Sequence, residues 1–283
     1  MSAEAMQTAA GFVQQLAKDL NSDELELPMF PDSVIRIQSA FQAPEVDLDD
    51  IVQIISSDPA LTSRILQLSN SAAIRGTKEI VEVRQAVIRI GNKLVQSTAV
   101  AFAIRQAERN KDLSEESRAA LKSIWAESVE LASRCYVIAK AFTKLSADEA
   151  LLTGLLSVLG KLYIFMKAEA VDGLAYSEFE DILASWHPAI SKAIAESWNM
   201  SQELVAALES QLETNPELKE AASLAEVLSA ARLLMEYEAS GEPLVASEYP
   251  LLLRLGIANH NEDAVTLAEH AEAIDAIRQG LSG

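Results

Sequence analysis

Signals that start and stop helices recur along the whole chain, and they constrain the fold more than any other feature. No run of residues alternates apolar with polar side chains clearly enough to predict a sheet. Hydrophobic residues make up 49% of the sequence but aromatic residues only 5%, so a core must consist mainly of Ala, Leu, Ile and Val. Together these features predict an all-α fold in which helices pack on helices.

The pair Asp58 and Pro59 is the strongest local signal for the start of a helix. The carboxylate can accept hydrogen bonds from the first backbone N–H groups, and proline suits the first helical position because no N–H is needed there. The predicted helix ends at Asn70 and Ser71, whose short side chains can bond to nearby backbone groups. These two residues could instead bind a ligand in a cleft between lobes. The structural interpretation is favoured because local backbone bonding already accounts for them.

Gly91 predicts a boundary between two helices. A helix from about residue 83 runs into this glycine, which suits a left-handed C-terminal cap, and a long helix follows to about residue 109. With Arg84, Arg89 and Lys93 nearby, this arrangement resembles a helix-turn-helix in outline. Many helix pairs share such a turn, so sequence-specific DNA binding is not expected.

Two further signals divide the second half of the chain. Ser146 with Glu149 forms a capping box before the apolar stretch 151–166. Pro188 lacks the N–H that a helix interior needs, so it predicts a break near His187 and a new helix that continues to Trp198.

The charge distribution limits the choice of partner. The net charge is −19, and such a chain repels a phosphate backbone on average, which makes nucleic-acid binding unlikely. Residues 75–111 differ, because eight basic and three acidic residues give this segment a local charge of +5. One interpretation is a set of solvated helix faces. The other is a docking face for an acidic partner or a nucleotide, formed by Arg75, Arg84, Arg89 and Lys93.

Cysteine usage and hydropathy indicate the compartment. Cys135 is the single cysteine, so no intramolecular disulfide or Cys-based zinc site is expected, and its apolar helical surroundings predict a buried thiol. No basic segment followed by an apolar one marks a secretory signal at the N-terminus. The stretch 151–166 is interrupted and shorter than a bilayer requires. We therefore expect a cytoplasmic protein that does not enter a membrane.

Several motifs occur in the order and spacing of one known family, although none of them is specific alone. In chain order their residues are Asp58, Pro59, Asn70, Ser71, Gly91, Trp125, Ser128, Gly160, Lys161 and Trp198. Over roughly residues 25–230 the chain resembles the HDOD (HD-related output domain) family. This resemblance implies a two-lobed, multi-helix bundle related to the HD superfamily of metal-dependent phosphohydrolases.

The resemblance also implies a division of the chain. A lead-in helix occupies residues 1–24, the HDOD domain residues 25–230, and a C-terminal helical extension residues 231–283. Within the domain, an N-lobe covers about 25–112 and an HD-like lobe about 113–215.

The enzymes of the HD superfamily hold a divalent ion with a His, an adjacent His-Asp pair and a later Asp. The ion activates a water molecule for attack on phosphorus. The segment 155–161 resembles the stretch around that pair, but Ser157 and Val158 stand where His and Asp would stand. Valine cannot ligate a metal, and serine is a poor ligand. The resemblance thus implies a retained helical frame whose metal positions are emptied, and we expect no cofactor.

His187 is the residual candidate for a metal ligand, because it resembles a histidine retained in related phosphodiesterases. The other histidines, His260 and His270, do not have the i, i+4 spacing of helical zinc motifs. Residues 208–211, which should supply a later His pair, read Leu-Glu-Ser-Gln. A lone histidine beside a proline is more often a capping or core group, and we expect no metal there.

Three functional hypotheses follow from these residues. The leading one is a non-catalytic regulatory module that transmits a signal by binding another protein or a small ligand. The second is a divergent metal-dependent phosphohydrolase of the HD type. The third is binding of a nucleotide second messenger without hydrolysis, through the basic segment 75–111. The apolar helices after residue 216 could cover the core or form the face of a homodimer.

Overall fold

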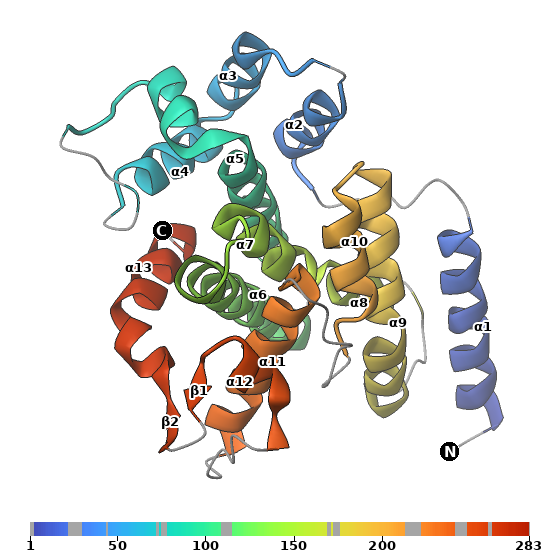
Figure 1. The fold of residues 1–283 in the computed structure, drawn as a ribbon. Helices are drawn as coiled ribbons and strands as arrows, with labels where there is room; N and C mark the ends of the chain where they lie inside the picture. Colours follow the sequence, from blue (N-terminus) through green and yellow to red (C-terminus); the bar gives the residue numbers. More distant parts are fainter. Residues whose placement is uncertain are drawn as a thin grey trace.

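The computed structural model describes residues 3–21, 30–43, 45–71, 74, 78–108, 115–168, 171, 176–212, 222–240, 248–259 and 262–282. Nearly all regular structure in these ranges is helical, which confirms the all-α class, and the helices form two groups (Figure 1). One small antiparallel hairpin is added near the C-terminus, where β1 (Ala258–Asn259) pairs with β2 (Glu262–Val265).

The first group carries the predicted helix start at Asp58. Its helices are α2 (Asp32–Gln42), α3 (Leu48–Ser56), α4 (Pro59–Ser69) and α5 (Val83–Glu108). The Asp58 carboxylate accepts hydrogen bonds from the backbone N–H groups of Ala60 and Leu61 at 3.0 and 3.1 Å, and Pro59 occupies the first turn. The predicted cap is therefore confirmed, because the local side-chain geometry alone satisfies the free N–H groups of the helix.

Gly91 bends α5. Its φ of 74° and ψ of 167° interrupt the helical backbone. The predicted boundary is confirmed, but the predicted left-handed cap is wrong, because ψ in the left-handed helical region is close to 47°. This combination of angles is essentially restricted to glycine. α5 thus consists of two helical segments that meet at a kink at Gly91.

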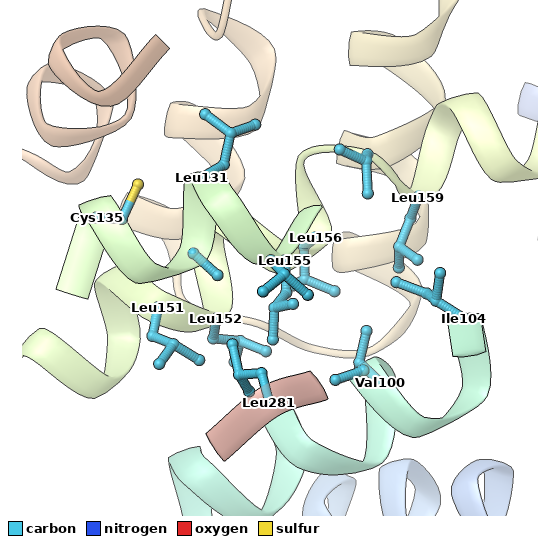
Figure 2. Packing of buried hydrophobic residues seen from close by; sticks show 14 of the residues in the cluster. Val100, Ile104, Leu131, Cys135, Leu151, Leu152, Leu155, Leu156, Leu159 and Leu281 are labelled. Atoms are coloured by element: carbon cyan, nitrogen blue, oxygen red, sulfur yellow. The ribbon is translucent and has the colours of Figure 1, made fainter. Parts of the chain in front are cut away.

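The second group surrounds the apolar helix α7. Its members are α6 (Glu115–Phe142), α7 (Ala147–Leu156), α8 (Leu159–Ala168), α9 (Tyr176–Ser197), α10 (Gln202–Glu209) and α11 (Leu224–Ser240). Every residue of α7 from position 150 to its end is buried. Figure 2 shows its leucines between Val100 and Ile104 of α5 and Leu131 and Cys135 of α6. Burial raises the pKa of the Cys135 thiol to about 12, as expected for a structural cysteine.

The apolar stretch 151–166 is divided between two helices. A turn at Ser157 and Val158 separates α7 from α8. The segment Ala147–Ala168 is long and apolar enough to cross a bilayer, but 83% of its most apolar window is buried inside the protein. In this structure it is a core element, because the helices around it already cover its apolar surface.

The predicted break at Pro188 is wrong. Helix α9 continues through this proline from Tyr176 to Ser197. An interior proline costs roughly 3 kcal/mol, because it removes one hydrogen bond and crowds the preceding turn. Buried side chains on both sides of the proline, including Ile182, His187 and Ile194, anchor the helix against its neighbours. Tertiary packing therefore overrides the local preference.

The two ends of the chain pack against both groups. Helix α1 (Ala3–Leu20) lies within the predicted lead-in segment 1–24, and Asp19 accepts a hydrogen bond of 2.7 Å from the Tyr163 hydroxyl of α8. Helix α12 (Pro250–Arg254), the hairpin, a 3₁₀ helix (Thr266–His270) and α13 (Ala271–Ser282) complete the described chain. Leu281 of α13 is buried beside α5 and α7 (Figure 2).

Two glycines allow helices to approach at backbone distance. A Cβ atom on Gly154 would lie 2.6 Å from the Cα atom of Ala132 in α6. A Cβ atom on Gly160 would lie 2.0 Å from the carbonyl oxygen of His187 in α9. Neither neighbour can move aside without moving its helix, since the clashing atoms belong to the backbone. The turn between α7 and α8 is thus fixed on two sides.

We predict that Gly160→Ala destabilises the protein by at least about 2 kcal/mol, because overpacking against backbone forces the helices apart. Gly11→Ala is the matched control, since nothing lies within 4 Å of a Cβ atom there. This control should be neutral or stabilising by up to about 1 kcal/mol, as alanine favours a helix over glycine. Urea unfolding of both variants measures the difference, and equal midpoints would contradict the assigned contact.

Candidate functional site at the turn between α7 and α8

The two residues that the family resemblance places at the metal-binding pair are packed into the core. Ser157 and Val158 have no exposed surface. The Ser157 hydroxyl donates a hydrogen bond of 2.8 Å to the carbonyl oxygen of Gly154, one turn earlier in α7. Its role is therefore to end α7, in the manner of short hydroxyl side chains near helix ends.

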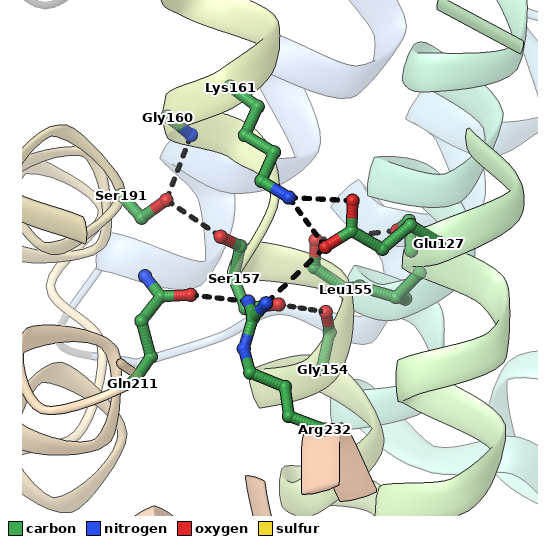
Figure 3. Close-up of polar contacts among 10 residues, drawn as sticks. Glu127, Gly154, Leu155, Ser157, Gly160, Lys161, Ser191, Gln211 and Arg232 are labelled. Atoms are coloured by element: carbon green, nitrogen blue, oxygen red, sulfur yellow. Dashed lines mark hydrogen bonds and ion pairs between the residues drawn. The ribbon is translucent and has the colours of Figure 1, made fainter. Parts of the chain in front are cut away.

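A buried hydroxyl fastens this turn to α9. Ser191 accepts a hydrogen bond of 2.8 Å from the backbone N–H of Gly160 and donates one of 3.2 Å to the carbonyl oxygen of Ser157 (Figure 3). A helix start leaves backbone N–H groups without intrahelical partners, and burial would make such groups costly. Ser191 satisfies one of them at the beginning of α8.

An ion-pair cluster lies beside the turn. Lys161 Nζ donates to both carboxylate oxygens of Glu127 at 2.6 and 2.7 Å. Arg232 Nη1 lies 3.4 Å from Glu127 Oε1, and Arg232 Nη2 donates to Gln211 Oε1 at 2.8 Å. Figure 3 shows these side chains converging from α8, α6, α11 and the turn after α10. The cluster therefore joins four segments that are distant in sequence.

His187 is buried next to this cluster, with 2% of its surface exposed. Its side chain makes a hydrogen bond with the backbone of Ser157, and Nδ1 has no partner. Burial first, and then the positive charges of Lys161 and Arg232, lower the pKa of His187 to about 3. The imidazole is accordingly neutral at physiological pH.

These residues do not fit a divalent metal. A metal site needs several free oxygen, nitrogen or sulfur donors around one point. Here the Glu127 carboxylate is engaged by an ammonium and a guanidinium group, and the Ser157 hydroxyl is bonded to the backbone. Within the described ranges, no three His, Cys, Asp or Glu side chains gather in a group that could hold a metal ion. A cation entering the cluster would also meet Lys161 and Arg232.

The basic residues of 78–108 do not share one free face. Arg84 forms an ion pair with Asp49. Arg89 donates to the carbonyl oxygens of Ser69 and Lys78 at 3.3 and 3.0 Å. Arg75, the fourth residue of the expected docking face, lies outside the described residues.

Lys93 is also engaged within the protein. Its ammonium group lies 3.6 Å from Glu149 Oε1, and the same oxygen accepts a 2.5 Å hydrogen bond from the Ser201 hydroxyl. Ser146 accepts from the backbone N–H of Glu149 at 3.2 Å, as the capping box predicts. The Glu149 carboxylate, however, turns toward Lys93 and Ser201, the cap of α10. Glu149 thus links α5, α7 and α10.

Most family-motif residues have structural contacts. Asn70 holds the segment before α5, because its amide accepts from the N–H of Ile80 at 2.9 Å and donates to the Ile80 carbonyl oxygen at 2.8 Å. Trp125 lies under the Arg105 guanidinium at 5.9 Å. Ser128 and Trp198 contact, respectively, the Leu155 carbonyl oxygen at 3.5 Å and the Phe30 ring at 6.0 Å between centroids.

Three members of the cluster were not identified from the sequence: Glu127, Gln211 and Arg232. Glu127 lies between two motif residues, Trp125 and Ser128, and this position is the one sequence feature that could have identified it as a site residue. Gln211 ends the segment 208–211, which the family resemblance places at the metal site. Nothing in the sequence around Arg232 marks it as a neighbour of Lys161, because Arg232 is 105 positions from Glu127.

The all-helical fold of this chain is shared with solved structures of other proteins. A Shewanella amazonensis SB2B protein that carries the name of a metal-dependent phosphohydrolase superposes with a TM-score of 0.72, at 22% identity, over 97% of this chain and 99% of the other. A Marinobacter aquaeolei VT8 protein that carries the name of a signal transduction protein gives a TM-score of 0.59, at 20% identity, over 97% and 66%. At such identities these likenesses establish the fold alone.

The sequence places the chain more narrowly. Residues 27–214 match the HDOD domain model, and the chain belongs to the HDOD family. An uncharacterized protein of Treponema pallidum (strain Nichols) is 28% identical over 197 residues, which are 64% of this chain. The aligned region covers 36% of that relative, so this chain spans about a third of its length.

The lowered pKa of His187 predicts a pH-dependent stability. Its pKa is about 3 in the folded protein against an ordinary 6.5, so the unfolded chain binds more protons between these values. Stability from this group is therefore lost as pH falls below 6.5, by about 2 kcal/mol at pH 5. His187→Gln removes this dependence. Urea unfolding at pH 8 and pH 5 should show the wild type losing about that much relative to the variant, and a pH-independent difference would contradict the assignment.

Proposed function

We propose that this HDOD protein is a non-catalytic regulatory module that acts in signal transduction by binding another protein or a small ligand. The observation that carries the proposal is the burial of Ser157 and Val158, which the family resemblance places at the metal-binding pair, beside an ion-pair cluster of Glu127, Lys161 and Arg232. Side chains that cannot hold a divalent ion cannot use it to activate water. The helical frame is kept, and its interior is stabilised by internal charges.

The alternative of a divergent metal-dependent phosphohydrolase has less support. It requires an ion near two fixed cations, and the nearest histidine already uses one ring nitrogen for a backbone hydrogen bond. Nucleotide binding through Arg84, Arg89 and Lys93 also has less support, because each already has an internal partner. DNA binding is disfavoured by the net charge of −19.

We also propose a cellular compartment and a division into lobes for this chain. We propose a cytoplasmic protein whose N-lobe covers about residues 25–112 and whose HD-like lobe covers about 113–215. The lead-in helix over 1–24 and the extension over 231–283 pack on this domain. The extension supplies Arg232 to the cluster, which supports a single folded unit. A protein partner in a signalling pathway, or a second copy of this chain, would bind on its outer surface.

We predict that purified protein hydrolyses neither nucleotides nor cyclic dinucleotides when Mg²⁺, Mn²⁺ or Fe²⁺ is added. It should contain well below one equivalent of transition metal by elemental analysis. A catalytic HD-type relative, assayed in parallel, is the positive control. Metal-dependent turnover that is abolished by His187→Ala, in a variant that remains folded, would overturn the proposed function.

A further inference from the structure

The cluster beside the α7–α8 turn contains more hydrogen-bond donors than acceptors. Lys161 offers three N–H groups, Arg232 five and Gln211 two. The acceptors that they reach within the cluster are the Glu127 carboxylate and Gln211 Oε1, which together take four of these bonds. Arg232 Nε and Gln211 Nε2 are buried and have no hydrogen-bond partner. Buried donors of this kind are costly unless an acceptor satisfies them.

The cluster also carries an unbalanced positive charge. Lys161 and Arg232 share the single carboxylate of Glu127, and His187 is neutral at physiological pH. Two other buried or half-buried carboxylates on the same helices have partners of their own. Glu130 of α6 binds Arg134, and Glu226 of α11 binds Arg254. One positive charge therefore stays uncompensated in a partly buried place.

The cluster is accessible at its edge. The side chains of Lys161, Arg232 and Glu127 have 17%, 15% and 26% of their surface exposed, whereas Gln211 is 1% exposed. The charged groups thus lie between solvent and the buried amide. A small ligand would reach the guanidinium and the ammonium first and the Gln211 amide last.

We propose that Lys161, Arg232 and Gln211 bind a phosphate group, carried by inorganic phosphate or by a phosphorylated small metabolite such as a nucleotide. A phosphate supplies several acceptor oxygens and a negative charge, which match the free donors and the unpaired positive charge. Arginine is particularly suited to phosphate because its planar fork presents parallel N–H groups. The inference rests on the proposed function, because a catalytic divalent ion would need Glu127 as a ligand and would be repelled by the Lys161 and Arg232 cations that would hold the phosphate.

The ligand would act as a link between elements. Lys161 belongs to α8, Gln211 follows α10, and Arg232 belongs to α11. A phosphate held by all three would strengthen the contact between the HD-like lobe and the first helix of the C-terminal part. Ligand occupancy would in this way control how firmly that part is attached, which is the form of control expected of a regulatory module.

The test is thermal unfolding and titration calorimetry of the full chain with inorganic phosphate, with chloride at matched ionic strength as the reference. Phosphate should raise the unfolding temperature and give saturable binding, whereas chloride should not. Titration with nucleoside mono- and diphosphates then separates the two sources. Binding at least tenfold tighter than that of inorganic phosphate identifies a phosphorylated metabolite, and equal affinity identifies the phosphate group itself. No saturable binding of any of these probes overturns the inference.

Variants locate the site. Gln211→Glu places a second carboxylate beside Arg232, so it should weaken phosphate binding at least tenfold while the protein without phosphate stays as stable as the wild type. Arg232→Gln should cause a similar loss, and it provides the test if the first variant does not fold. Lys192→Gln is the control, because this lysine of α9 pairs with Glu209 on the surface and its removal changes the net charge equally. Phosphate affinity should be unchanged in this control.

Unchanged affinity in both cluster variants overturns the inference. The hydrolysis assay, and not the phosphate titration, tests the proposed function. Metal-dependent hydrolysis contradicts the regulatory function whatever the phosphate result, whereas a chain that neither hydrolyses nor binds phosphate contradicts only the phosphate site.

Discussion

The backbone contact between α8 and α9 at Gly160 and His187 is the constraint on which the centre of this protein depends. It leaves no space for a side chain at position 160, and Gly154 imposes the same condition against α6. The turn between them carries Ser157 and Val158, which the family resemblance places at the metal-binding pair. Because both flanks are fixed by backbone, the turn keeps its geometry whatever side chains stand at positions 157 and 158.

Features set by local geometry could be predicted from the sequence, whereas features set by distant segments could not. The cap at Asp58 was predicted because a carboxylate and the next N–H groups are covalent neighbours. The uninterrupted α9 was not, since burial around Pro188 outweighs a local cost of roughly 3 kcal/mol. For the site, Ser157 and Lys161 follow from the motif order. Arg232 does not, because it meets Glu127 across 105 positions.

The charge distribution also depends on contacts between distant segments, which the sequence does not reveal. Counting residues predicted a basic surface over 75–111, but Arg84 and Lys93 there are each matched by a carboxylate from another helix. The uncompensated positive charge lies elsewhere, where Lys161 and Arg232 share the single carboxylate of Glu127, in a chain whose net charge is −19. A sequence gives the number of charges in a segment, and only the fold decides which of them cancel. The cluster of Lys161, Arg232 and Glu127 is accordingly positive, although the chain as a whole is strongly negative.

The C-terminal part of the chain contacts both groups of helices. A partner or ligand bound to this part could therefore affect the packing of both groups. Arg232 in α11 reaches the cluster beside α8, while Gly280 in α13 lies against Leu68 of α4. Leu281 is inserted beside α5 and α7 (Figure 2). Arg232 belongs to α11, and Gly280 and Leu281 belong to α13, so two different C-terminal helices make these contacts. The charges of the cluster therefore connect α11 to α6 and α8.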